Sequence, residues 1–258
     1  MKSLRWMTTP LLGAMLWASV SWGATMRTDL TRENRLPEIR DIEVSVEGTY
    51  QTLGDRDEDF IDNDITMNTA ELQLKYGVNR DFALTAALPG IRNEIGPEDA
   101  EIGVGDLRVG FELRAFEHPY DLPYVLPYLE VSLPTGDEDK GQGAGDVTAV
   151  GGVAVGTEIY EFVRWGLDAA AVATPDDVYL RLGTHVIWEL SPRFSVLSEF
   201  QYTGYPDEVN RNEILFNAGM VYRPQDLWQV GLYGGGSLDG EKSDNRVAVR
   251  ITRTFDDR

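Results

Sequence analysis

The sequence contains no cysteine among its 258 residues and only two histidines. The absence of cysteine excludes disulfide cross-links and thiolate metal sites, and it is compatible with export. Basic residues are scarce: 23 Lys and Arg stand against 43 Asp and Glu, which gives a net charge of -20. Proteins that bind nucleic acid need a basic surface to replace phosphate counterions, so this balance excludes nucleic acid as a partner.

Long apolar runs are missing beyond the N-terminus. There, Lys2 and Arg5 precede an apolar stretch at 11–20, and small residues follow up to Ala24. This order is typical of a secretory signal, so we expect residues 1–24 to be cleaved and the protein to be exported. No later stretch reaches the roughly 18 apolar residues of a transmembrane helix. If the chain enters a membrane, it does so as strands.

From about residue 41 onward, apolar and polar residues alternate with period two. In the first segment Ile42 and Val44 share one face, while Glu43 and Ser45 share the other. Twelve segments show this alternation: 42–50, 70–76, 82–88, 107–113, 128–133, 146–157, 162–173, 178–190, 194–202, 214–222, 228–234 and 246–255. Strands that separate lipid from water require such a pattern.

The pattern predicts an all-β fold, namely a transmembrane antiparallel up-and-down β-barrel of about twelve strands. The barrel should occupy residues 41–258 as one domain, because barrels of this length commonly form a single unit. Residues 25–40 are highly charged and should form either a periplasmic segment or a plug in the lumen. An even number of strands returns both ends of the barrel to one side.

The connections between the segments alternate in length. Short turns are expected at 79–81, 117–123, 158–161, 191–193 and 223–226. Mostly longer loops are expected at 54–64, 90–104, 135–145, 204–213 and 237–245, and only the brief connection at 174–177 breaks the alternation. Outer-membrane barrels have short periplasmic turns and longer external loops, so both ends of the barrel should lie in the periplasm.

Aromatic residues flank the five short turns and also close the last strand. These residues are Tyr76, Phe82, Phe116, Tyr124, Tyr160, Phe162, Trp188, Phe194, Tyr222, Trp228 and Phe255. Amphipathic rings are favoured at the headgroup level of a bilayer. We therefore expect them to form an interfacial girdle on the periplasmic rim.

Ionisable side chains fall on the polar faces of the predicted strands. We expect these residues to line the lumen: Glu43, Glu47, Glu71, Lys75, Arg108, Glu112, Arg114, Glu130, Arg164, Asp168, Arg181, His185, Glu189, Glu199, Arg246 and Arg250. On the lipid face, an Arg or Lys near the bilayer midplane would cost about 2–4 kcal/mol. The mixed signs allow two interpretations, a cross-lumen ion-pair network or the lining of a water-filled path, and the two are compatible.

No pattern assigns a catalytic, cofactor-binding or metal-binding residue. A hydrolase would need a nucleophile beside His185, and Ser195 or Ser198 on the next strand are the candidates. The acidic loop at 54–64 lacks the glycine and closing glutamate of a calcium-binding EF-hand loop, so a solvated loop is the simpler interpretation. The glycine-rich stretch at 141–146 lacks the ending of a phosphate-binding loop and is interpreted as a flexible external loop.

Short glycine- and proline-based motifs mark the strand ends. They are Leu88-Pro89, Gly103-Val-Gly105-Asp106-Leu107, Leu133-Pro134-Thr135-Gly136 and Gly143-Ala-Gly145-Asp146. With these motifs, residues 41–255 resemble the family of outer-membrane transport barrels named after the MetA pathway of phenol degradation. The resemblance implies a barrel that moves small molecules, aromatic ones among them, across the outer membrane, and it implies no catalytic residue. One departure is that Asp256-Asp257-Arg258 follows Phe255, where many such barrels end on an aromatic residue that assists assembly.

The leading hypothesis is a passive channel or transporter for small solutes in the cell outer membrane, and not an enzyme. Its partners would be membrane lipid and lipopolysaccharide, a small-molecule solute and the outer-membrane assembly machinery. The acidic loops should favour cations or neutral solutes over anions. The alternatives are a plugged structural or surface barrel without transport and an outer-membrane lipid hydrolase. Neutralising a pair such as Arg108 and Glu112 should separate an open channel from a plugged barrel, and a soluble barrel would fractionate with the periplasm.

Overall fold

The computed structural model describes residues 36–53, 65–95, 100–115, 123–160, 162–205, 212–238 and 245–255. Its strands are β1 (Ile42–Leu53), β2 (Ile65–Asn79), β3 (Phe82–Ile95), β4 (Glu101–Val104), β5 (Leu107–Leu113), β6 (Tyr124–Leu133), β7 (Thr148–Tyr160), β8 (Val163–Ala173), β9 (Val178–Ser191), β10 (Phe194–Gly204), β11 (Glu213–Gln225), β12 (Trp228–Ser237) and β13 (Asn245–Phe255). A 3₁₀ helix, η2 (Glu138–Lys140), lies between β6 and β7. Among the described residues, no helix is long and apolar enough to cross a bilayer.

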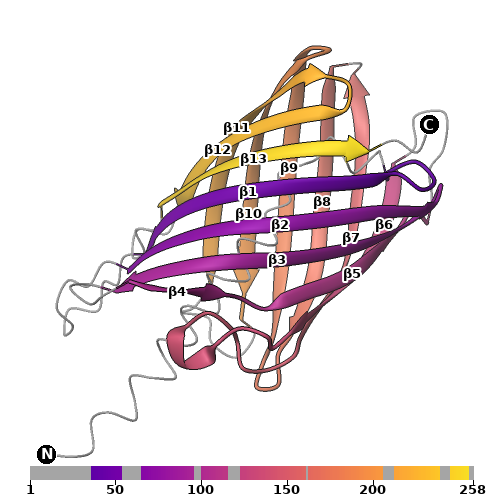
Figure 1. Ribbon diagram of the computed structural model, residues 1–258. Helices are drawn as coiled ribbons and strands as arrows, with labels where there is room; N and C mark the ends of the chain where they lie inside the picture. Colours follow the sequence, from indigo (N-terminus) through magenta and orange to yellow (C-terminus); the bar gives the residue numbers. More distant parts are fainter. Residues whose placement is uncertain are drawn as a thin grey trace, which may run out of the picture.

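The strands form one closed antiparallel barrel (Figure 1). Apart from β4 and β5, which both pair with β3, neighbouring strands in the sequence pair with each other, and β1 closes the ring by pairing with β13. β3 pairs with β5 near the short-turn end and with β4 at the opposite end, so β4 and β5 together occupy one strand position in the barrel. The barrel therefore has twelve strand positions, which confirms the predicted twelve-stranded fold.

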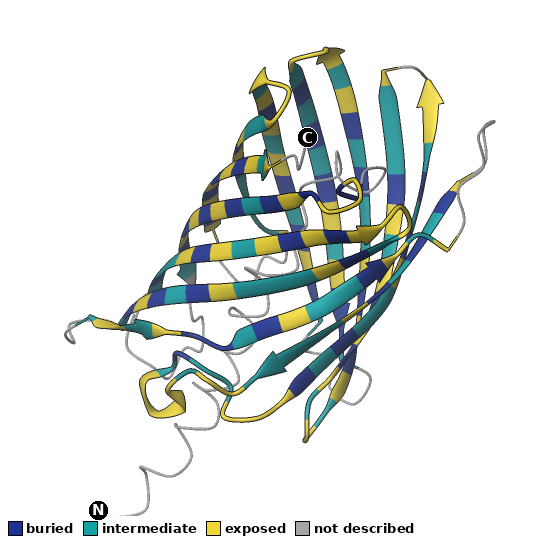
Figure 2. Ribbon diagram, turned by 45° about the vertical axis from the view of Figure 1, so that its right-hand side comes forward, coloured by how far each residue is buried: buried dark blue, intermediate teal, exposed yellow. Residues whose placement is uncertain are grey.

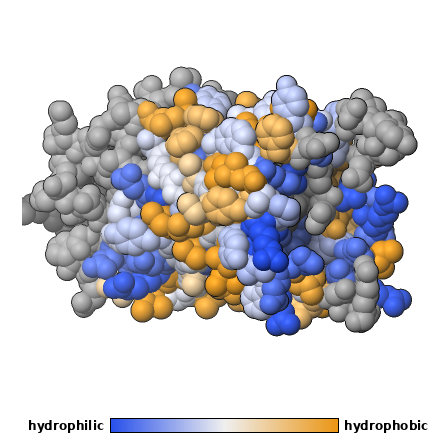
Figure 3. Space-filling view, turned by 90° about the horizontal axis from the view of Figure 1, so that it is seen from above, coloured by the Kyte–Doolittle hydropathy of each residue, from blue (hydrophilic) through white to orange (hydrophobic). Residues whose placement is uncertain are grey.

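Side chains alternate between the two faces of the wall, so buried and exposed positions form bands along the strands (Figure 2). The outward positions are mostly apolar: Val46 lies opposite both Leu72 and Ile251, and all three are exposed. Apolar side chains gather over the central part of the face in Figure 3. This arrangement suits a wall whose outer face contacts lipid and whose inner face is polar.

One rim carries the short connections, and β1 begins and β13 ends at this rim (Figure 1). Tight turns join β2 to β3, β7 to β8, β9 to β10 and β11 to β12. The connections at the opposite rim include 134–147 and 174–177. The predicted loop at 54–64, with its acidic residues, lies outside the described residues.

Two strands are longer than predicted at the long-loop rim. β2 begins at Ile65 and β3 continues to Ile95, so the predicted loop at 90–104 is wrong and is mostly strand. The outward side chains of this extension include Arg92 and Glu94, which form an exposed ion pair at 3.2 Å. Backbone pairing can continue beyond the apolar band, because water rather than lipid surrounds such side chains there. The alternation of apolar residues therefore does not reveal this extension of β2 and β3.

The chain before β1 lies against the inner wall at the short-turn rim. Leu36 is buried in a cluster with Ala83, Tyr124, Leu126 and Ala154. The amide of Arg40 donates to the Gly77 carbonyl at 2.8 Å. A Cβ at Gly77 would lie 2.2 Å from the Glu38 carbonyl oxygen, so only glycine allows this contact. Of the predicted segment 25–40, residues 36–40 thus contact the barrel wall, and residues 25–35 lie outside the described residues.

Candidate functional site in the barrel lumen

Fifteen of the sixteen predicted lumen residues lie in strands, and Arg114 directly follows β5. Eleven are buried: Glu43, Glu47, Glu71, Lys75, Arg108, Glu112, Arg181, His185, Glu199, Arg246 and Arg250. Five are partly exposed: Arg114, Glu130, Arg164, Asp168 and Glu189. Buried charges must be paired or hydrogen-bonded to remain ionised, so their partners determine what the lumen can do.

Glu47 on β1 is shared by two arginines of β13. Its Oε1 accepts from Arg246 at 2.8 Å, and its Oε2 accepts from the Arg250 Nε at 2.6 Å. Arg250 lies directly opposite Glu47 in the register of the two strands. This charge cluster joins the first strand to the last, which is where the barrel closes.

Glu71 on β2 lies directly opposite Glu47, which places two like charges side by side. Such a pair is destabilising unless each carboxylate has its own cation. Glu47 has the β13 arginines, and Glu71 is bound by Arg108 from β5. The Gln73 amide also donates to Glu71 at 2.5 Å. Arg108 reaches past β3 to do so, and its second nitrogen lies 4.0 Å from Glu130.

Two further ion pairs join strands of the barrel. Lys75 binds Glu112 at 2.5 Å across the small inward side chains of β3, and Arg164 binds Glu189 at 2.5 Å between β8 and β9. Arg108 is paired with Glu71, so treating Arg108 and Glu112 as one pair was wrong. The error arose because Arg108 and Glu112 share β5, whereas each binds a partner on β2.

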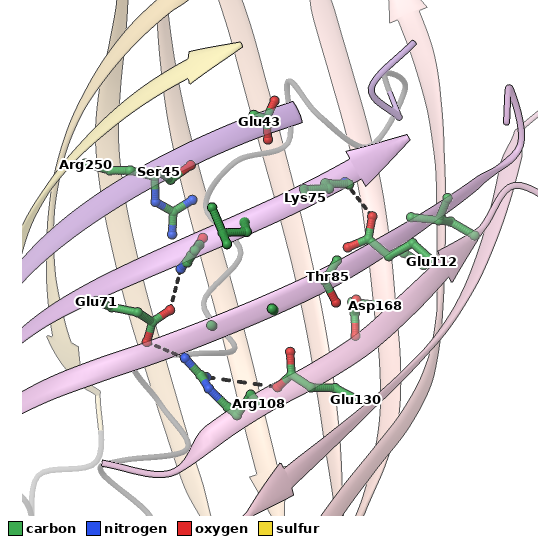
Figure 4. A pocket seen from close by; sticks show the side chains of 16 residues that line it. Glu43, Ser45, Glu71, Lys75, Thr85, Arg108, Glu112, Glu130, Asp168 and Arg250 are labelled. Carbon is green, nitrogen blue, oxygen red and sulfur yellow. Dashed lines mark hydrogen bonds and ion pairs between the residues drawn. The ribbon is translucent and has the colours of Figure 1, made fainter. Parts of the chain in front are cut away.

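A pocket opens inside the barrel beside the Lys75–Glu112 and Arg108–Glu71 pairs (Figure 4). Eight of the predicted lumen residues line it: Glu43, Glu71, Lys75, Arg108, Glu112, Glu130, Asp168 and Arg250. The small or apolar side chains of Ala86, Ala87, Leu126 and Ala154 complete part of the lining. The site therefore offers charged groups of both signs beside apolar surface.

Asp168 on β8 is held by a neutral group. The Tyr128 hydroxyl on β6 donates to its Oδ1 at 2.7 Å. Tyr128 has to cross β7 to reach Asp168, and it does so over Gly152, where a Cβ would lie 2.5 Å from the phenol ring and oxygen. A glycine on β7 is thus required for the contact between two strands that are not neighbours.

The connection 134–147 is anchored to the wall, so the expectation that its glycine-rich stretch at 141–146 is flexible was wrong. The Asp106 carboxylate accepts from the amides of Gly136 and Ala144 at 2.9 and 2.8 Å. Asn93 donates to the Gly141 carbonyl at 2.8 Å, and Gln142 is buried. Asp106, Asn93 and Gln142 were not singled out as lumen residues, although Asp106 lies in one of the glycine motifs.

The exposed tip of this connection carries one ion pair. Lys140 lies 3.0 Å from Asp137 in η2. Its hydrogen bond and positive charge lower the pKa of Asp137, and the carboxylate in turn raises the pKa of Lys140. Both side chains are exposed, so the pair contributes little to stability.

Most of the predicted girdle residues lie on the outer face or at the short-turn rim. Exposed rings are found at Tyr76, Tyr160, Phe162, Trp188, Tyr222 and Phe255, while Phe82, Phe194 and Trp228 are partly exposed. The prediction that Tyr124 belongs to the girdle was wrong, because its side chain is 7% exposed and faces the interior beside Leu36. Its strand begins at Tyr124 itself, so its register follows the inward residue Leu126. Phe116 lies outside the described residues.

Neither of the two candidate serines lies beside His185. Its partner across the pair of strands is Glu199, whereas Ser195 lies opposite Glu189. Four residues along a strand correspond to about 13 Å. Ser198 points to the other face of the sheet. Among the described residues, no group of three or more His, Asp or Glu is placed to hold a metal ion.

No known family model and no curated protein sequence matches this chain. Its structure is similar to that of an outer membrane channel from Pseudomonas putida F1, with a TM-score of 0.72 and 16% identity over 86% of this chain and 97% of that one. It is also similar to the translocator domain of the autotransporter NalP from Neisseria meningitidis, with a TM-score of 0.61 and 9% identity over 94% and 98% of the two chains. The KdgM porin gives a TM-score of 0.58 and 9% identity over 82% and 99%. These similarities show the transmembrane barrel fold; the resemblance to the phenol-degradation family stays a prediction.

Proposed function

We propose that this chain is an outer-membrane channel through which small solutes pass by diffusion. The observation that carries the proposal is the pocket inside the barrel, which is lined by ionised groups of both signs and by apolar side chains. A lumen that only filled space could be packed with apolar residues, as small barrels are. Charged groups in a pore determine which solutes enter it.

Three further points support this function. The outer face of the barrel is apolar, which suits insertion in a bilayer. The N-terminal signal expected at 1–24 would export the chain, and the similar folds include an outer membrane channel and a porin. The expected cargo is small and includes aromatic molecules, which could contact Leu126 and Tyr128 on the inner wall.

The second candidate is a plugged barrel that does not transport. The observation that favours it is the set of buried ion pairs, which could hold the lumen closed. The paired variants Lys75→Gln and Glu112→Gln distinguish the two functions. In a channel each should change solute flux, whereas in a plugged barrel each should lower stability and leave flux absent.

Liposome swelling tests the proposed function directly. Purified protein, refolded into liposomes, should admit a small neutral sugar such as arabinose faster than empty liposomes do. A large trisaccharide serves as the size control and should be excluded. Swelling no faster than in protein-free liposomes, at a protein content where the KdgM porin is active, would contradict the proposal.

A further inference from the structure

Most of the charged groups that line the pocket are already compensated. Lys75 binds Glu112, Arg108 binds Glu71, and Arg250 binds Glu47. A solute that binds any of these groups must first compete with a charge of the protein. The groups that remain available to a solute are therefore those without an opposite charge.

Asp168 is such a group. Within the described part of the chain, its carboxylate accepts the Tyr128 hydroxyl at 2.7 Å and forms no ion pair. The residues opposite it on both neighbouring strands are small, Ala154 on β7 and Gly183 on β9. The carboxylate lines the pocket and is partly exposed to it (Figure 4). A neutral phenol orients the negative charge without cancelling it.

Arg181 on β9 is a second charged group without an opposite charge, and it lies outside the pocket lining. It is only 7% exposed, yet it makes no hydrogen bond or ion pair with any residue that the structure describes. A guanidinium without a carboxylate partner can bind an anion by charge-assisted hydrogen bonds. Its inward position, opposite Ala170, directs it toward the lumen.

These two charges are diagonal neighbours across β8 and β9. Asp168 lies opposite Gly183, two residues from Arg181, and diagonal neighbours on one face are about 7–8 Å apart. The second diagonal pair of charges on the same strands, Arg164 and Glu189, forms an ion pair at 2.5 Å. Strand twist makes the two diagonals inequivalent, and the bond from Tyr128 draws Asp168 toward β6, away from Arg181.

Apolar side chains lie between and beside the two charges. Tyr128, Ala170 and Val172 belong to one buried cluster with Tyr179, which stacks on Tyr205 at 4.9 Å between ring centroids. An ammonium group could bind Asp168 and contact the face of Tyr128. A carboxylate could bind Arg181 by charge-assisted hydrogen bonds. The apolar part of the same molecule would then contact Ala170 and its neighbours.

We propose that Asp168 and Arg181 form a two-point subsite for a small zwitterion, one that carries an ammonium group, a carboxylate and an apolar side chain. The subsite rests on the proposed function, because it would select solutes during their passage. It specifies the class of solute that the lumen retains best. The Arg164–Glu189 pair, being closed, contributes no such site.

Binding to folded protein in detergent micelles tests the subsite without requiring flux. Equilibrium dialysis would compare three probes of similar shape: phenylalanine, 2-phenylethylammonium and 3-phenylpropionate. Wild-type protein should bind phenylalanine most tightly. Asp168→Asn, which keeps an acceptor for Tyr128, should weaken phenylalanine and 2-phenylethylammonium about tenfold, the effect of one charge-assisted bond, and should not weaken 3-phenylpropionate.

Arg181→Gln should show the complementary pattern, weakening phenylalanine and 3-phenylpropionate but not 2-phenylethylammonium. Arg181→Lys keeps the charge and should retain part of the binding, which guards against a folding defect in the glutamine variant. Asp146→Asn, which removes the charge of an exposed residue in the connection 134–147, is the control, and its binding of all three probes should be unchanged.

The subsite is wrong if wild-type protein binds the three probes equally or binds none, or if both charge variants keep the wild-type preference. Sugar flux into liposomes separates this failure from that of the proposed function. Flux without zwitterion preference would overturn the subsite alone. Preferential binding without flux would overturn the channel and leave the subsite as a binding site.

Discussion

Two walls of the lumen differ in how far their inward charges are paired. On the wall of β13, β1, β2 and β5, the arginines and the lysine are bound to glutamates of neighbouring strands. On the wall of β8 and β9, Arg164 and Glu189 form an ion pair, while Asp168 and Arg181 form none with the residues that the structure describes. Inward charges therefore serve two purposes. Paired charges connect strands, and unpaired charges are available to a solute.

Removing a shared partner on the paired wall should have the largest effect. Glu47→Gln removes the carboxylate that binds both Arg246 and Arg250, and breaking a buried pair costs about 3–5 kcal/mol. We expect the free energy of unfolding in urea to fall by about that amount. Glu189→Gln is the control, since its side chain is 33% exposed, and it should cost no more than about 1 kcal/mol. Equal losses in both variants would contradict the distinction between the walls.

Adding a methyl group at Gly152 should disturb the wall of β8 and β9 around Asp168. A Cβ there would meet the Tyr128 ring and hydroxyl at 2.5 Å, so Gly152→Ala should displace the phenol from Asp168. Overpacking of this kind costs about 1–3 kcal/mol. Thermal unfolding should show the loss, and Gly48→Ala, where no atom lies within 4 Å of the new Cβ, should show none. An unchanged melting temperature for Gly152→Ala would refute the close contact.

Loss of the Asp106 carboxylate should loosen the connection 134–147 and leave both walls intact. Asp106→Ala removes the acceptor of two backbone amides, each bond being worth about 1 kcal/mol. We expect trypsin to cleave after Lys140 faster in this variant. Asp146→Ala, an exposed residue of the same connection, should leave the cleavage rate at the wild-type value. The anchoring role is excluded if the two variants are cleaved at the same rate.

The smallest effect should come from the exposed pair at the tip of this connection. Lys140 lowers the pKa of Asp137, so the folded carboxylate ionises at lower pH than the unfolded one. Its contribution is present above the unfolded pKa and is lost as the pH falls through the folded pKa. In an NMR titration, Lys140→Gln should return the Asp137 midpoint toward its ordinary value. A midpoint that does not move would show that the pair is absent in solution.

The sequence predicted the barrel well because lipid and water impose a strict alternation on its strands. The inward register of Glu47, Arg108 and Arg181 follows from that alternation alone. The partners do not follow from it, because Arg108 reaches Glu71 past an intervening strand. The inward ring of Tyr124 and the anchored connection at Asp106 were missed for a related reason. Both depend on contacts between segments that are distant in sequence.

The conductance of single channels in a planar bilayer tests the central claim most directly. A potassium chloride gradient across the membrane gives both the conductance and the reversal potential. We predict a steady conductance with a preference for potassium over chloride, because acidic residues outnumber basic ones in the chain. Absence of conductance, or a reversal potential that indicates preference for chloride, would contradict this account.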